Sequence, residues 1–213
     1  MAITLDDPWL VVSLGGEHEC FGWTFRNGGL TTSDRIAWRA VRNEDLTEDF
    51  DITPWLAAET ARYGVADAPC FLTSARIGDF AQARVQVEGI TAHAVATAGL
   101  GNAERIGTRL APEGHIGTIN VMVAVDRPLS LAAKIEAISL ISEARTTAMI
   151  ARGHLIATGI ATGTGTDCIC LASAIGAAPM TMAGKHTATG EAVGAAAYQA
   201  LAAAINRWQD PSL

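Results

Sequence analysis

The clearest pattern of hydrophobic and polar positions lies at residues 118–125, which alternate between two mostly apolar faces. One face would carry Ile119, Val121, Val123 and Val125, and the other would carry Thr118, Asn120, Met122 and Ala124. Successive side chains of a strand point to opposite sides, and strands that are apolar on both faces are usually covered on both sides. This segment therefore predicts an internal strand.

Other segments show shorter versions of the same patterns. Alternation or a short apolar run predicts strands at residues 9–14, 35–40, 84–88, 90–97, 155–160 and 168–172. Gly89 separates two of these strands and predicts a hairpin turn between them. The strand at 155–160 is expected to lead directly into a loop rich in threonine and glycine.

Three segments predict helices, at residues 53–64, 130–152 and 189–208. Thr53 is expected to cap the first helix, because a proline follows it at the favoured first helical position. A serine precedes the apolar stripe of the second helix and a glycine follows it. In the third helix Gly190 and Gly194 are four residues apart, which predicts a smooth ridge for close packing.

Alternating strands with two long helices predict an α/β fold, a layered sandwich with a mostly β core. With no linker or repeat visible, we expect residues 1–213 to form a single domain. Alanine and glycine supply much of the apolar content, since 49% of residues are hydrophobic but only 6% are aromatic. Helices so rich in small residues would allow close contact with a second copy, as in a homodimer.

Charge and cysteine content exclude several classes of protein. The net charge is −7 and lysine and arginine do not cluster, which argues against nucleic-acid binding. The four cysteines form no CxxC pair and no zinc spacing, so no metal site is expected. No secretory signal or apolar run of about 18–20 residues is visible. We therefore expect a cytoplasmic protein with no membrane partner.

The most unusual composition lies at residues 161–167, here called the threonine loop. It comprises Ala161, Thr162, Gly163, Thr164, Gly165, Thr166 and Asp167. Because glycine destabilises helices and strands by roughly 0.5–1 kcal/mol relative to alanine, we predict a binding loop. In one interpretation its backbone amides bind a phosphate, as successive amides do in anion-binding loops. In the other, its amides and hydroxyls stabilise an oxyanion. A tight turn between strands is the remaining interpretation. A cysteine at position 168 excludes the G-x-G-x-x-G pattern.

Four residues are candidates for catalysis. His186 stands just before the last helix, where a histidine is well placed as a general base. Asp167 is expected either to orient a histidine or to stabilise a local turn, and Glu191 either takes part or only complements the helix dipole. Thr118 or water is the candidate nucleophile, with His186 or Asp167 as the base that accepts the proton.

Further polar residues are expected to assist catalysis or to stabilise a helix. Asn120 shares a face with Thr118 and is expected to stabilise an oxyanion. Thr187 is a candidate cap for the last helix, as is Thr189. Glu143 and Arg145 form a pair of opposite charge on the long helix, with surface solvation as the alternative explanation.

Several motifs occur together in a characteristic order. They are TAGLGNA at 97–103, GTIN at 117–120, EAR at 143–145, ATGTGTD at 161–167, and GKHT at 184–187 followed by Gly190 and Glu191. From about residue 10 to 205, the chain resembles the adenosylcobinamide amidohydrolases of corrinoid salvage, the CbiZ family. Arg145 stands where that family usually has lysine, and residues 15–27 match less well.

This resemblance implies hydrolysis of the amide that joins the aminopropanol arm to the corrin ring, releasing adenosylcobyric acid. Some relatives also act on complete cobamides. The cobalt belongs to the corrinoid substrate, so the resemblance implies no cofactor. Catalysis would involve His186, Asp167, Thr118 and Glu191. The motif residues then expected to bind substrate are Thr97, Gly99, Asn102, Asn120, Glu143, Arg145, Thr162, Gly163, Thr164, Gly165, Thr166 and Thr187.

A fainter similarity covers residues 117–129, which resemble the Gly-Ser/Thr strand of DmpA-type aminopeptidases and ornithine acetyltransferases. It implies an αββα sandwich, and in those enzymes self-cleavage exposes the hydroxyl residue as an N-terminal nucleophile. We use it here as an indication of fold. Two other functions remain open at this point: a non-catalytic corrinoid-binding protein, and a nucleotide or phosphate-ester enzyme that uses the threonine loop.

Overall fold

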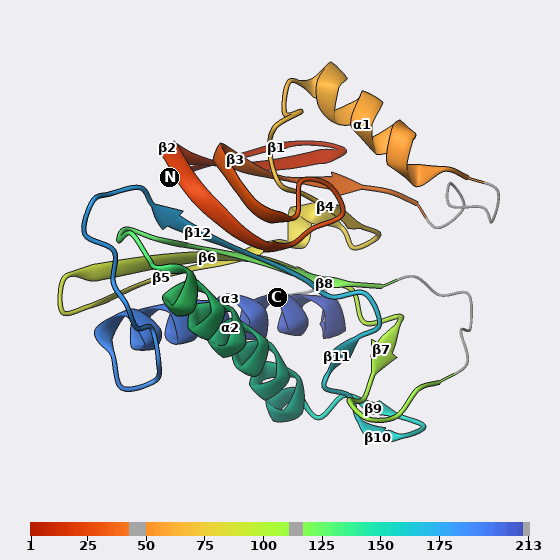
Figure 1. Cartoon of the computed structure of the whole chain (residues 1–213). Coiled ribbons are helices and arrows are strands. Elements are labelled where there is room, and N and C mark those ends of the chain that lie inside the picture. The colour runs from red at the N-terminus through yellow and green to blue at the C-terminus, as the bar shows by residue number, and fades with distance from the viewer. Residues whose placement is uncertain (43–49, 111–116, 211–213) are drawn as a thin grey trace.

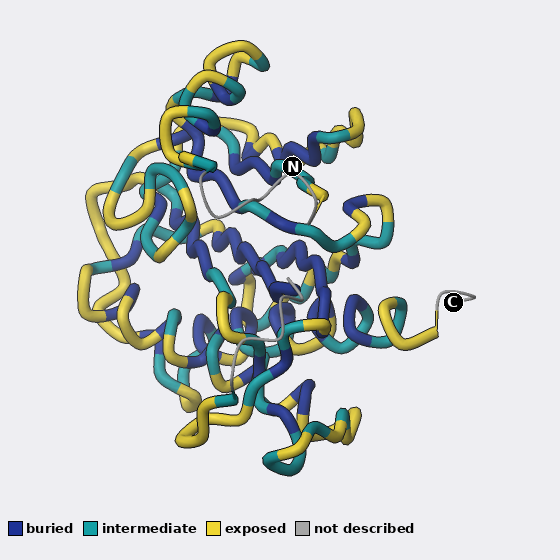
Figure 2. The backbone as a smooth tube through the Cα atoms, turned by 90° about the vertical axis from the view of Figure 1, so that its right-hand side faces the viewer, coloured by how far each residue is buried: buried dark blue, intermediate teal, exposed yellow. Residues whose placement is uncertain are grey.

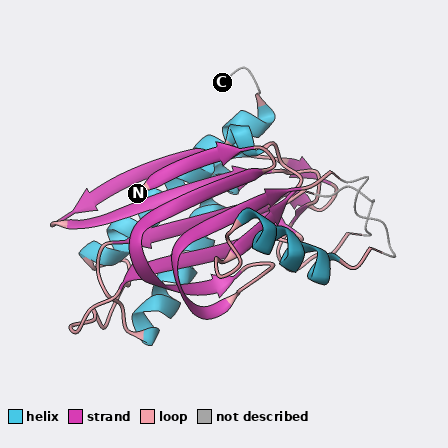
Figure 3. Ribbon diagram, turned by 90° about the horizontal axis from the view of Figure 1, so that it is seen from above, coloured by secondary structure: helices cyan, strands magenta, loops and turns pink. Residues whose placement is uncertain are grey.

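The computed structural model describes residues 1–42, 50–110 and 117–210. Most strands belong to one large sheet (Figure 3). This sheet has eight strands in the order β4-β3-β2-β12-β8-β6-β5, with β1 paired to β2. These strands are β1 (Ala2–Asp6), β2 (Trp9–Trp23), β3 (Gly29–Ala40), β4 (Cys70–Thr73), β5 (Ala81–Val87), β6 (Ile90–Ala98), β8 (Ile119–Val125) and β12 (Cys168–Ala174). The described residues also form helices α1 (Ile52–Tyr63), α2 (Leu131–Arg152) and α3 (Ala188–Gln209).

The molecule is layered, as the sequence predicts (Figure 1). Helices α2 and α3 cover one face of β5, β6, β8 and β12. On the opposite face the sheet folds back, so that Leu10, Trp38 and Phe71 of β2, β3 and β4 pack against Met122 and Cys170 of β8 and β12. Helix α1 covers the outside of this second β layer. The order of layers is therefore helix, strand, strand, helix, and both β layers belong to one curled sheet.

The predicted internal strand is the centre of that arrangement. Strand β8 lies between β12, which is parallel to it, and β6, which is antiparallel. Its branched residues face α2 and α3, while Met122 and Ala124 face the curled part of the sheet. Figure 2 shows the buried residues concentrated where the layers meet.

Two of the three helix starts follow the expected chemistry. The Ser130 hydroxyl accepts from the Ala133 amide at the start of α2, and the Thr187 hydroxyl caps α3. Thr53 does not cap α1, because Asp51 takes that role and accepts a hydrogen bond from the Thr53 amide at 3.2 Å. A carboxylate with the right backbone geometry two residues earlier displaces the hydroxyl as the cap.

Two strand predictions need correction. Residues 155–160 are not one strand but a tight hairpin of β9 (Leu155–Ile156) and β10 (Gly159–Ile160), turned with Gly159 at a φ of 114°. The strand predicted at 9–14 continues to Trp23, and it bends where its register with β3 shifts between Ser13 and His18. That bend allows the sheet to fold over itself.

The small-residue ridge predicted on α3 is only half present. A Cβ on Gly190 would lie 2.1 Å from the Gly184 carbonyl oxygen, so the backbone there does pack closely. A Cβ on Gly194 would meet no atom within 4 Å. None of the helices in the described part of the chain is long and apolar enough to cross a membrane.

Candidate functional site

The threonine loop is fixed to the segment that follows β6. Its residues Gly163–Thr164 form strand β11, which pairs with β7 (Ala103–Glu104). The Gly165 amide donates to the Asn102 carbonyl oxygen at 3.0 Å. Two of the predicted motifs, far apart in sequence, therefore form one hydrogen-bonded unit.

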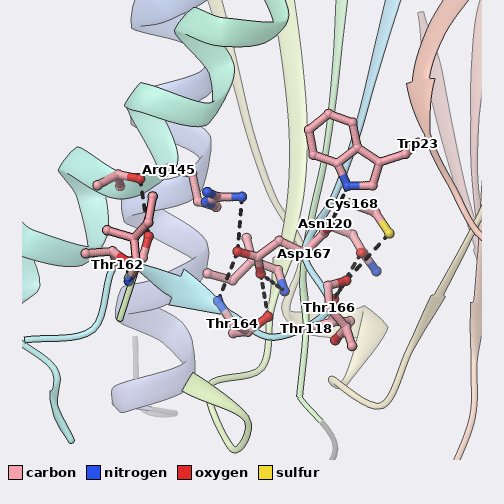
Figure 4. A network of polar contacts seen from close by, with 12 residues as sticks. Trp23, Thr118, Asn120, Arg145, Thr162, Thr164, Thr166, Asp167 and Cys168 are labelled. Carbon is pink, nitrogen blue, oxygen red and sulfur yellow. Dashed lines mark hydrogen bonds and ion pairs between the residues drawn. The ribbon is translucent and has the colours of Figure 1, made fainter. Parts of the chain in front are cut away.

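Asp167 is the centre of this unit (Figure 4). Its Oδ1 accepts from the Ile119 amide at 3.1 Å and from the Thr164 hydroxyl. Its Oδ2 accepts from the Thr164 amide at 2.9 Å and forms an ion pair with Arg145 Nη1 at 3.1 Å. The side chain is only 6% exposed. Burial raises the pKa of this carboxyl, against the opposing effects of Arg145 and Thr164. The carboxyl thus joins the loop to β8 and α2.

The proposed nucleophile and oxyanion residue lie beside Asp167 but are already hydrogen-bonded. The Thr118 hydroxyl donates to the Thr166 carbonyl oxygen at 2.8 Å and approaches Asn120 Oδ1 at 3.3 Å. Asn120 Nδ2 donates to the Leu72 carbonyl oxygen at 3.0 Å. Thr118 is 5% exposed and Asn120 is fully buried. In this conformation neither polar group faces solvent.

The glycines of the threonine loop allow close packing. A Cβ on Gly163 would lie 2.4 Å from Asp167 Oδ2, and a Cβ on Gly165 would lie 3.1 Å from Asn102 Nδ2. Gly99 is similarly close to the Ala75 side chain, at 3.3 Å. The glycines make room for neighbouring protein atoms here.

The hydroxyls of Thr162 and Thr166 are also hydrogen-bonded to protein atoms. The Thr162 hydroxyl accepts from the Ile106 amide at 2.8 Å, and the Thr166 hydroxyl donates to the Gly117 carbonyl oxygen at 3.1 Å. Thr97 is 1% exposed, and its hydroxyl has no hydrogen-bond partner among the described residues.

Two residues of this region were missed by the sequence interpretation. Trp23, at the end of β2, donates from its indole to the Asp167 carbonyl oxygen at 2.6 Å, across 144 residues of sequence. The Cys168 thiol lies 3.6 Å from the Thr166 carbonyl oxygen. Burial, followed by the charge of Asp167, raises the pKa of this thiol to about 11. Cys168 is therefore a thiol at neutral pH and a poor nucleophile. The aromatic-rich segment before residue 27 was the one available signal for Trp23.

A second region is a groove between the two long helices, here called the α2–α3 groove. It is a shallow groove, largely open to solvent, with a volume of about 340 Å³. Its charged and polar walls are Glu143, Thr147, Lys185, Glu191 and Tyr198. Its other lining residues are Leu140, Ala144, Gly190, Gly194 and Ala195. Residues three and four apart on each helix share a face, which is why short motifs on α2 and α3 converge there.

The charged groups of the α2–α3 groove remain accessible to solvent. Lys185 and Glu143 form an ion pair whose side chains are 66% and 52% exposed. Glu191 is exposed in the first turn of α3, where the helix dipole favours its negative charge. The groove thus presents one ammonium and two carboxylates to a ligand.

His186 belongs to the α2–α3 side of the molecule. It is exposed and lies between Lys185 and Thr187, which caps α3. Asp167 precedes β12, whereas the segment containing His186 leaves the other end of that strand (Figure 1). In the described part of the chain, no hydrogen bond or ion pair joins His186 to Asp167 or Thr118. The structure therefore separates the predicted catalytic residues into two groups.

Residues 1–42, 50–110 and 117–210 offer no cluster of metal-ligating side chains. There, no three histidine, cysteine, aspartate or glutamate side chains gather as a metal site.

Comparison with known proteins gives a match over nearly the whole chain. The family model of adenosylcobinamide amidohydrolase, CbiZ, matches residues 2–212. No curated protein matches the chain. Among solved structures, the PH0078 protein from Pyrococcus horikoshii OT3 is similar at 11% identity and a TM-score of 0.45, covering 93% of this chain and 77% of that one.

Proposed function

The chain belongs to the adenosylcobinamide amidohydrolase family, and from this premise we propose the reaction and its location. The protein hydrolyses the amide between the aminopropanol arm and the corrin ring of adenosylcobinamide. The products are adenosylcobyric acid and free aminopropanol. Cobalt arrives as part of the substrate, and the enzyme works in corrinoid salvage in the cytoplasm.

The amide is cleaved in the α2–α3 groove. The observation that carries this assignment is the accessibility of its ionisable groups. Glu143, Lys185 and Glu191 line this groove and are open to a ligand. In contrast, the polar atoms of Asp167 and Thr118 already bond to other parts of the protein. A reacting group must be within hydrogen-bond reach of the substrate.

Water is the nucleophile in this proposal. Glu191 or His186 accepts a proton as water adds to the carbonyl carbon, and Lys185 stabilises the negative charge that develops on the oxygen. The carbon–nitrogen bond then breaks, and the accepted proton passes to the leaving amine. Water supplies the new oxygen of the carboxylate, so no covalent intermediate on Thr118 is needed.

The threonine loop has a positioning role. Arg145 connects it to α2, and α2 also carries Glu143 and Thr147 of the groove. The substrate contacts expected for the loop, and for Thr97, Gly99 and Asn102, stay predictions.

The direct test is incubation of purified protein with adenosylcobinamide, with products identified by mass. We expect adenosylcobyric acid and aminopropanol from the wild type and from Gln199→Ala, an exposed α3 position outside the groove. Complete cobalamin as a second substrate tests whether the nucleotide-bearing arm is accepted. Unchanged adenosylcobinamide together with a raised Tm would contradict the enzyme and indicate a corrinoid-binding protein.

A further inference from the structure

Helix α3 is rich in alanine but contains two glycines, Gly190 and Gly194. Glycine is the least favourable helix residue apart from proline, so each glycine in the helix calls for a physical cause. The two have different surroundings, and the difference is informative.

Packing within the protein explains the glycine at position 190. A Cβ there would lie 2.1 Å from the Gly184 carbonyl oxygen and 2.5 Å from the Ala183 carbonyl oxygen. Both contacts are with backbone of the segment that leads into α3, which cannot move aside without disturbing the Thr187 cap. Alanine is therefore excluded at position 190 by packing.

No packing contact of this kind explains the glycine at position 194. A Cβ there would meet no atom within 4 Å. The residue is half-buried and lines the α2–α3 groove, four residues after Gly190 and beside Ala195. Alanine would fit the fold and favour the helix. The space above Gly194 is therefore empty of protein atoms although a better helix former would fill it.

We propose that Gly194 is the floor of the substrate site, and that the apolar part of the aminopropanol arm lies against its backbone. This inference rests on the function proposed above. The arm combines a methyl group with a hydroxyl and an amide. An apolar floor with Glu143, Lys185 and Glu191 on the walls matches that combination. A volume of about 340 Å³ is at the small end for ligand sites, and it suits an arm rather than a whole macrocycle.

The proposal makes Gly194 a specificity-determining residue, with a distinctive pair of effects on substitution. Gly194→Ala should raise the Tm by about 2–4 °C, because alanine has the higher helix propensity and its methyl group clashes with no protein atom. It should also raise KM at least fivefold with kcat changed less than twofold. Gly194→Leu should raise KM further, because it fills the groove.

The experiment measures Tm, kcat, KM and the calorimetric Kd for adenosylcobinamide on the same preparations. Gly190→Ala is the matched glycine control and should lower the Tm. Gln199→Leu adds bulk to an exposed α3 position outside the groove and should leave KM and Kd unchanged. Calorimetry reports binding even where turnover is slow.

Three outcomes overturn the proposal. The first is a Gly194→Leu protein with wild-type KM and Kd beside an active wild type. The second is a change of oligomeric state by sedimentation with binding unaffected, because Gly194 would then serve contact with a second copy of the chain. The third is a wild type that neither binds nor cleaves adenosylcobinamide, which removes the proposed function as well and so is distinguishable from the first two.

Discussion

The threonine loop and the α2–α3 groove differ in what their polar groups are bonded to. In the loop, the Asp167 carboxyl and the hydroxyls of Thr164 and Thr166 bond to other protein atoms. In the groove, the Lys185–Glu143 ion pair and Glu191 are exposed to solvent. A segment rich in glycine and threonine can therefore be a hydrogen-bonded structural network, while the charged groups around the groove stay accessible to a ligand.

Helix α2 connects the two regions. Glu143 and Arg145 are two positions apart, and residues at that spacing face different sides of a helix. Glu143 pairs with Lys185 in the groove, and Arg145 pairs with Asp167 in the loop. Through Arg145, the threonine loop thus holds in place the helix that forms one wall of the groove. In the proposed mechanism the loop positions α2, and the groove carries out the reaction.

Substitution of Glu191 should have the largest effect. If this carboxylate transfers the proton, Glu191→Gln lowers kcat by about 10²–10⁴-fold. The Tm should change by only about 1–4 °C, because the residue is exposed and contributes mainly through the helix dipole. Steady-state kinetics and thermal unfolding on the same sample test both expectations.

His186→Ala, measured in parallel, separates the two candidate bases. A kcat within threefold of wild type for both variants would remove the proton-transfer role from the groove and return it to the loop.

Asp167→Ala should have the next largest effect, on stability rather than on chemistry. It leaves the Ile119 and Thr164 amides and the Arg145 guanidinium without a buried acceptor. Breaking a buried ion pair costs about 3–5 kcal/mol of unfolding free energy. Asp34→Asn, which breaks an exposed pair with Arg35, should cost less than about 1 kcal/mol. Urea unfolding compares the two, and equal losses would show that the loop network is not structural.

Thr118→Val tests whether the hydroxyl beside the threonine loop is structural or catalytic, and its effect on stability should be smaller than that of Asp167→Ala. It keeps the shape but removes the hydroxyl that donates to the Thr166 carbonyl oxygen. That oxygen keeps only the Cys168 thiol as a donor, so losing the hydroxyl's hydrogen bond should cost about 0.5–1.5 kcal/mol, and kcat should stay within threefold of wild type. A folded Thr118→Val protein with no turnover, together with an acylated wild-type enzyme in rapid-quench mass spectra, would make Thr118 the nucleophile.

The smallest expected effect is on pH dependence. Burial raises the pKa of Asp167 above its ordinary value of 3.8. A raised pKa in the folded state means that the folded protein binds the proton more tightly. This contribution to stability is therefore complete below pH 3.8 and is lost as pH rises through the folded-state pKa. The difference in unfolding free energy between wild type and Asp167→Asn should accordingly decrease as pH rises from about 3.8. An increase would show that Arg145 outweighs burial.

Local patterns predict the elements well and the site only in part. The two apolar faces of β8 and the caps of α2 and α3 follow from residues adjacent in sequence, and all three are confirmed. The contact between Trp23 and Asp167 depends on how the sheet curls, which no local pattern encodes. His186 and Asp167 are close in sequence, but β12 runs between them, so their separation in space does not follow from their separation in sequence.

The family motifs are short and ordered, which is why they can be recognised in a single sequence, and the family model confirms the family over residues 2–212. They do not say which members touch the substrate. Gly163 and Gly194 illustrate the limit, since one glycine accommodates Asp167 and the other faces an open groove. Composition alone does not distinguish a glycine required by protein packing from one beside an empty space.

The most direct test of the central claim is a crystal structure of Glu191→Gln soaked with adenosylcobinamide, which this variant should bind but cleave slowly. The account predicts that the aminopropanol arm lies between α2 and α3, with its amide beside Lys185 and its methyl group against Gly194. An arm bound against Thr118 and Asp167, with the threonine loop rearranged around it, would contradict the account and place the reaction in the loop.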